Sequence, residues 1–155
     1  MLIFKITDPE LNVLMARLFR ENIFDVFEVR GLEIATFTNF QVSGALDRVF
    51  DDLPEAGTAH CSWERVKPFA VSFIKGKKRP KSIKITLAHP SELTAQVHPN
   101  AAALFLNISY EHNEAQLSTA VSQKNFSLDK SVDGSWDDYI DAFFKNNNIP
   151  VSTRL

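Results

Sequence analysis

The chain has 155 residues, a net charge of −2 and a hydrophobic content of 45%, which is ordinary for a globular protein and predicts one domain over residues 1–155. Its single cysteine excludes an intrachain disulfide, and no apolar run approaches the roughly 20 residues that a membrane helix needs. Charges at Lys5 and Asp8 come too early for the apolar core of a signal peptide, so we expect a cytoplasmic protein with no membrane partner.

Positive charge is concentrated in one stretch of the chain. Eight of the 17 basic residues lie between Arg65 and Lys84, where there is no acidic residue. The other nine share the rest of the chain with all 19 acids, so the near-neutral total hides a segregation of charge. Because clustered positive charge attracts anions whatever the net charge is, this stretch is the first place to look for a partner.

The first half of the sequence predicts a strand, a helix and a hairpin. Alternating apolar residues predict a strand over residues 2–7, followed by a helix that Asp8 caps and Pro9 opens. The apolar residues of this helix recur at the spacing of one helix face, and they are Leu11, Leu14, Met15, Leu18 and Phe19. Beyond it, Arg30-Gly31 predicts a hairpin turn, residues 36–42 continue as a strand, and the acidic stretch 48–57 predicts a loop.

The second half predicts two helices and four strands. Ser62 is placed to cap a helix that Gly76 ends, although Pro68 implies that this helix either starts at the proline or is kinked there. Ser135, with Asp138 three residues later, predicts the start of the last helix. The expected strands cover residues 82–87, 104–110, 115–121 and 125–128, with a hairpin turn at 111–114 and a long loop between 87 and 103.

These elements follow the order β-α-β-β-(β)-α-β-β-β-β-α. The order predicts an α+β fold in which about three helices pack on a largely antiparallel sheet. The chain contains 13 phenylalanines, which carry no polar group, and we expect most of their rings in the core.

Five cations form the candidate binding site, which we call the basic loop (residues 75–81): Lys75, Lys77, Lys78, Arg79 and Lys81. Gly76 and Pro80 keep this segment out of regular structure, between the end of a helix and the start of a strand. Such a loop suits phosphate binding, and nucleic acid is the first candidate for an anionic partner. A solvated surface turn and a nuclear-targeting signal are the two alternatives.

No motif indicates a nucleotide cofactor, a metal or a catalytic residue. The five glycines form no phosphate-binding pattern, and the four histidines lack metal-ligand spacing; they are His60, His89, His98 and His112. We therefore expect a non-enzymatic binding protein without cofactor or metal. One alternative is a small hydrolase or transferase with a pocket formed by the loop between His89 and His98 together with Cys61. Another is a protein-interaction subunit, such as a homo-oligomer.

Four stretches resemble a small bacterial domain family of unknown function: FTNFQVSG at 37–44, FIKGKKRP at 73–80, LFLNISY at 104–110 and WDDYI at 136–140. The resemblance spans nearly the whole chain and implies a cytoplasmic bacterial protein, with no catalytic residue to carry over. The element order is also similar to one domain of a sliding clamp, in which helices line a DNA-facing surface. The sequence departs from that pattern, because a clamp ring needs several such domains and the first helix here carries only Arg17 and Arg20.

Overall fold

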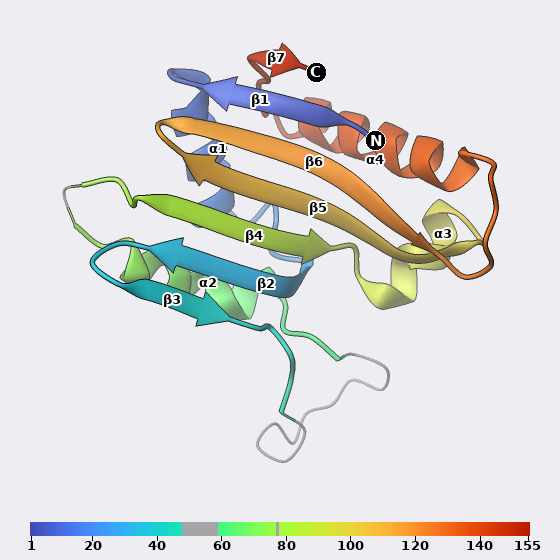
Figure 1. Cartoon of the computed structure of the whole chain (residues 1–155), viewed down its shortest axis with the longest axis horizontal. Helices are drawn as coiled ribbons and strands as arrows, with labels where there is room; N and C mark the ends of the chain where they lie inside the picture. Colours follow the sequence, from blue (N-terminus) through green and yellow to red (C-terminus); the bar gives the residue numbers. More distant parts are fainter. Residues whose placement is uncertain (48–58, 77) are drawn as a thin grey trace.

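The computed structural model describes residues 1–47, 59–76 and 78–155. They form a seven-stranded antiparallel sheet in the order β3-β2-β4-β5-β6-β1-β7 (Figure 1). The strands are β1 Ile3–Thr7, β2 Glu28–Ala35, β3 Asn39–Val42, β4 Ser82–Ala88, β5 Ala101–Glu111, β6 Glu114–Gln123 and β7 Thr153–Arg154. The helices are α1 Glu10–Phe19, α2 Trp63–Phe73, α3 Thr94–Val97 and α4 Ser131–Asn146, with a 3₁₀ turn, η1, at Ser91–Leu93. The predicted α+β class with a largely antiparallel sheet is confirmed.

Helices α1, α2 and α4 cover one face of the sheet, and they lie behind the strands in Figure 1. Alternate strand residues are therefore buried, among them Phe4, Ile6, Leu32, Ile34, Ile85, Leu87, Leu106, Ile108 and Leu117. Their neighbours point to the other face, where polar pairs occur: the Thr86 hydroxyl donates to Asn107 Oδ1 at 3.0 Å. Among the described residues, no helix has both the length and the apolar composition needed to cross a membrane.

Two tryptophans fix the helices on the core. Both side chains are fully buried, and each indole N–H has an acceptor on another element. Trp63 Nε1 donates to the carbonyl of Leu18 at 2.8 Å, which joins the start of α2 to the end of α1. Trp136 Nε1 donates to the carbonyl of Phe105 at 2.8 Å, which joins α4 to β5. Burial of a large ring together with a satisfied polar group makes each contact both strong and directional.

Two of the predicted helix starts are wrong. Asp8 does not cap α1: the N-cap is Pro9, and no side chain there bonds the helix backbone. The last helix begins at Ser131 rather than Ser135, because Asp129 Oδ1 accepts the backbone N–H of Ser131 at 2.6 Å. The Asp8 carboxylate instead accepts hydrogen bonds from Arg79, which is distant in the sequence.

The predicted turn at Arg30-Gly31 is also wrong. β2 runs through both residues and pairs with β4 on either side of an irregularity between Val29 and Gly31. The turn of the hairpin lies at residues 36–38 instead, so the continuous strand expected over 36–42 shortens to β3.

One further expectation in the second half is wrong: the strand expected over 125–128 does not form. The helix expected after Ser62 is confirmed, because Ser62 is the N-cap of α2 and, of the two alternatives left open, the helix runs through Pro68 instead of starting there. Two short helical segments, η1 and α3, lie in the long loop expected between residues 87 and 103. The acidic loop predicted over 48–57 lies outside the described residues, as does Lys77.

The phenylalanines are less buried than predicted. Among those described, Phe4, Phe24, Phe27 and Phe144 are buried, whereas Phe37, Phe69 and Phe126 are strongly exposed. The expectation of a core made of most of these rings therefore holds only in part.

Replacing Gly44 by alanine should destabilise the fold, because this residue has a φ of +75° and an added Cβ would lie 2.0 Å from the carbonyl oxygen of Val29. A strained left-handed residue costs about 1–3 kcal/mol, and we expect the free energy of unfolding to fall by at least that much. Urea denaturation measures the change. Gly31→Ala is the matched control, since nothing lies within 4 Å of its added Cβ. Equal losses in the two variants would contradict the assignment of strain to Gly44.

Candidate functional site

A groove of about 600 Å³ lies on the helix side of the sheet, between α1 and the carboxyl end of α2. Its floor is formed by Ile83 of β4 and Tyr110 of β5, which face each other across the ladder. The walls are apolar over most of their length, and their apolar side chains are Leu11, Met15, Ala16 and Phe19 of α1, Val71 of α2 and Ile74 just beyond it. A concave, mostly apolar groove of this size is typical of a ligand-binding site.

Positive charge surrounds the groove. Four of its lining residues are cations, and none is acidic: they are Arg20, Lys75, Lys78 and Arg79. Three of the four belong to the basic loop, which closes one end of the groove as it leads from α2 into β4. The electrostatic character of the groove therefore favours an anionic ligand with an apolar part.

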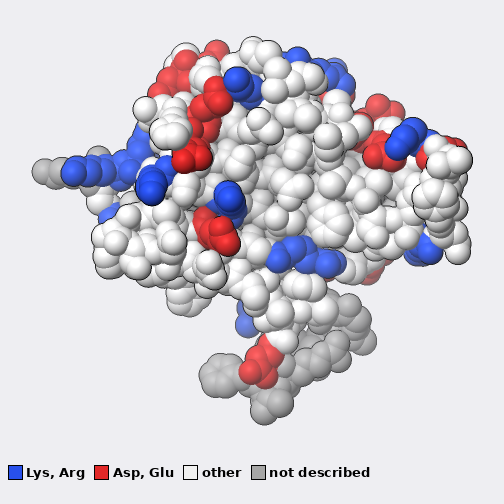
Figure 2. Space-filling view, viewed as in Figure 1, with Lys and Arg blue, Asp and Glu red and all other residues white. Residues whose placement is uncertain are grey.

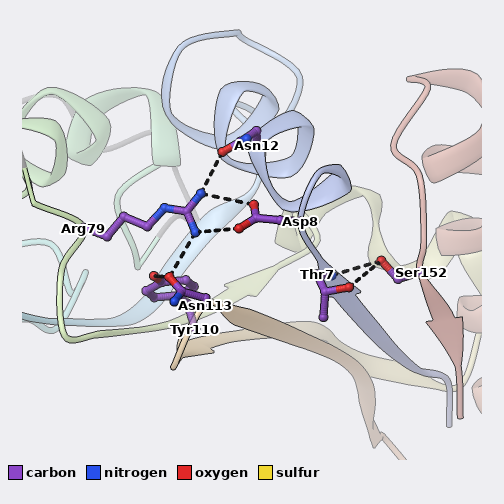
Figure 3. Close-up of polar contacts among 7 residues, drawn as sticks. All are labelled: Thr7, Asp8, Asn12, Arg79, Tyr110, Asn113 and Ser152. Atoms are coloured by element: carbon purple, nitrogen blue, oxygen red, sulfur yellow. Dashed lines mark hydrogen bonds and ion pairs between the residues drawn. The ribbon is translucent and has the colours of Figure 1, made fainter.

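Arg79 holds the basic loop in place (Figure 3). Its two terminal nitrogens donate to both carboxylate oxygens of Asp8 at 3.1 Å. One of them also donates to Asn12 Oδ1 at 3.0 Å and the other to Asn113 Oδ1 at 3.1 Å. The guanidinium thus joins the loop to the start of α1 and to the β5–β6 turn. The hydrogen bonds that Arg79 donates to Asp8 are also the main cause that raises the pKa of Arg79 above its ordinary value.

The five predicted site residues differ in their contacts with the rest of the protein. The side chains of Lys75, Lys78, Arg79 and Lys81 are all exposed, and the guanidinium of Arg79 is in addition bound by protein acceptors. The backbone N–H of Lys81 donates to the carbonyl of Ala35 at 2.8 Å, so the loop is also tied to β2. Figure 2 shows basic side chains projecting from the end of the molecule where this loop lies, while the middle of the sheet face carries few charges. Lys77 lies outside the described residues.

Sequence reasoning missed Arg20 and the apolar walls of the groove. The helical periodicity assigned Met15 and Phe19 to the buried face of α1, and both are only partly buried because they sit at its edge. The sequence also contained no signal that Asp8 and Asn113 would meet Arg79, since these residues are far apart along the chain.

The structure does not join the loop between His89 and His98 into one site. His89 is 6% exposed and packs against Tyr139, Trp136 and Phe27, with ring centroids 4.9, 5.5 and 6.1 Å away. His98 instead accepts the backbone N–H of Asn100 at 3.0 Å and lies 3.0 Å from the hydroxyl of Ser131. None of these residues lines the groove, nor does Cys61. A hydrolase or transferase at this loop stays a prediction that nothing tests.

A buried carboxylate fixes the same loop to the sheet. Glu28 is 5% exposed, and its Oε1 accepts from the backbone N–H and the hydroxyl of Ser91 at 3.1 and 2.9 Å. Arg30, whose guanidinium lies over the ring of Phe105, donates to the other oxygen at 3.4 Å. These contacts position η1, and no local pattern in the sequence indicated them. Within residues 1–47, 59–76 and 78–155, no three His, Cys, Asp or Glu side chains are arranged to hold a metal ion.

Fold and groove together define an α+β protein with an antiparallel sheet covered on one face and a cationic groove at one end. Comparison with family models matches residues 17–152 to a family of unknown function, DUF5721. Because the match covers most of the chain, the protein belongs to this family, and the resemblance to a family of unknown function is confirmed. No curated protein and no solved structure matches the chain, so the similarity to a sliding-clamp domain remains a prediction.

The contact between Asp8 and Arg79 can be measured with a double-mutant cycle of Asp8→Ala and Arg79→Ala. Both side chains are partly exposed, so we expect a coupling of about 0.2–1 kcal/mol in urea denaturation, near the upper end because the pair is bidentate. The control cycle uses Lys5 and Glu114, a pair of similar exposure joined by a 3.2 Å contact. A coupling for Asp8 and Arg79 no larger than for the control pair would contradict the anchoring role.

Stability should fall as the pH drops below about 6.5, because burial lowers the pKa of His89 below its ordinary value. The unfolded chain then binds a proton that the folded chain resists, and the loss approaches about 1.4 kcal/mol per pH unit for one such group. His89→Phe should reduce this slope, measured as the urea midpoint between about pH 7.5 and 5.5. His112→Gln, which changes an exposed histidine, should leave the slope unchanged. An identical slope in wild type and His89→Phe would refute the assignment.

Proposed function

We propose that this protein is a non-enzymatic binding protein whose basic loop and groove contact an anionic partner, with nucleic acid as the first candidate. The observation that carries the proposal is the groove itself, which four cations line and no acidic residue enters. Phosphates bound by lysine and arginine release condensed counterions, and this release drives association without any need for a base-specific contact.

In this proposal the cations have two roles, phosphate binding and positioning of the basic loop. Lys75 and Lys78 stand at the groove with exposed side chains and neutralise phosphates, and Arg20 does so from the end of α1. Arg79 acts on the partner indirectly, because its bonds to Asp8 set the position of the loop that carries the lysines. Lys81 extends the same charge toward β2.

The proposal includes a cytoplasmic setting in a bacterial cell, where nucleic acid is abundant. The lone Cys61 is consistent with a reducing compartment, in which structural disulfides are rare.

Salt-dependent binding tests the proposal. Labelled single-stranded and duplex DNA and RNA are titrated with the full chain at two salt concentrations. If Lys75 and Lys78 each neutralise one phosphate, the variant with both changed to alanine should bind single strands more weakly, and the slope of log K against log salt should fall by about 1.4.

The matched control changes Lys124 and Lys130 to alanine. Both lysines are exposed, and replacing them removes the same amount of charge at the other end of β6 and at the start of α4. This variant should bind like the wild type once the small change in net charge is allowed for. Absence of binding by the wild type contradicts the proposal, as does binding that neither salt nor the Lys75 and Lys78 changes affect.

A further inference from the structure

Phe37 is the most exposed large apolar side chain of the described residues, at 91%. It lies in the turn at residues 36–38 that joins β2 to β3, at the edge of the sheet. A single exposed ring is common on a protein surface, so the surroundings of Phe37, rather than its exposure alone, carry the argument.

The ring of Phe37 is supported from one side. It makes an edge contact with Phe40 of β3 at 5.7 Å, and Phe40 in turn stacks on Phe73 of α2 at 4.3 Å with the two planes 6° apart. The three rings form a continuous row from the last turn of α2 to the tip of the hairpin. Because Phe40 and Phe73 are only partly exposed, they orient Phe37 while leaving most of its surface open.

The same row borders the basic loop at both of its ends. Phe73 comes two residues before Lys75, and the backbone N–H of Lys81 donates to the carbonyl of Ala35, immediately before the turn that holds Phe37. No acidic residue occurs between residues 34 and 46 or between 65 and 84. The turn that holds Phe37 and the basic loop are therefore joined through Ala35 and Lys81, and neither segment carries an acidic residue.

We infer that Phe37 is a stacking platform for the bases of a single-stranded nucleic acid whose phosphates contact the basic loop. The inference rests on the proposed function and names its partner. An aromatic face beside a track of cations is how proteins bind single strands without reading sequence, since every base has a flat π-face and every nucleotide a phosphate.

A single strand fits this surface better than a duplex does. In a duplex the base faces are already stacked on one another, so a protein ring can reach them only after two bases have been unstacked, which is unfavourable. Phe37 would then add nothing to duplex binding, which would depend on the lysines alone.

The experiment compares Phe37→Ala with the matched control Phe126→Ala, which removes an equally exposed ring (88%) from the segment before α4. Binding of a labelled oligodeoxythymidine of about 20 nucleotides, longer than one binding site, is measured across a salt series. Loss of one stacking contact should weaken binding by Phe37→Ala about 5- to 150-fold with an unchanged salt slope. Phe126→Ala should bind like the wild type. Phe37→Tyr, which keeps an aromatic ring, should retain most of the wild-type affinity.

An abasic oligonucleotide of the same length separates stacking from charge. The wild type should bind it about as weakly as Phe37→Ala binds oligodeoxythymidine, and Phe37→Ala should bind both alike. If the wild type binds the abasic strand as tightly as the normal one, or if Phe37→Ala binds like the wild type, the stacking inference is overturned while salt-dependent binding through the lysines stands. If no oligonucleotide binds, the proposed function itself fails. If Phe37→Ala instead lowers the sedimentation mass without changing oligonucleotide binding, the ring serves self-association and the inference is likewise overturned.

Discussion

Burial of a single face of the sheet is the constraint on which the rest of this structure depends. Every second residue of the central strands enters one core, and α1, α2 and α4 must all lie on that side to cover it. The buried indoles of Trp63 and Trp136 set where two of these helices sit. Because α1 and α2 meet near Trp63 and leave a groove beyond it, the apolar edge of α1 remains open over Ile83 and Tyr110.

Connections at one end of the sheet then decide the chemistry of that groove. The turn at 36–38, the basic loop, the β5–β6 turn and the start of α1 all lie at this end, because neighbouring antiparallel strands share their ends. Arg79 uses this proximity to join three of these segments. A surface ion pair adds little to stability, but four hydrogen bonds on one guanidinium define where the adjacent lysines stand.

The elements with a clear period were predictable from the sequence, whereas their ends were not. The first helix, β4, β5 and β6 lie close to the expected residues, because a buried stripe must repeat at the period of its own backbone. Asp8 and Ser135 were assigned to caps that do not form, and Gly31 to a turn that does not exist. Capping and turn residues have several local uses, and long-range pairing chooses among them. Composition predicted that most phenylalanines would be buried but could not say which ones, and Phe37 and Phe126 are among those that are exposed.

By itself the sequence determined the α+β class, the order of most elements and the concentration of positive charge between Arg65 and Lys84. These follow from periodicity and composition, which are properties of neighbouring residues. Only the tertiary structure decided that Arg79 binds Asp8, that Lys75 and Lys78 line a groove with Arg20, and that an exposed Phe37 borders the same loop. The physical reason is distance along the chain: these groups meet because strands pair and helices pack on one face, and no local pattern records which distant residues that packing brings together.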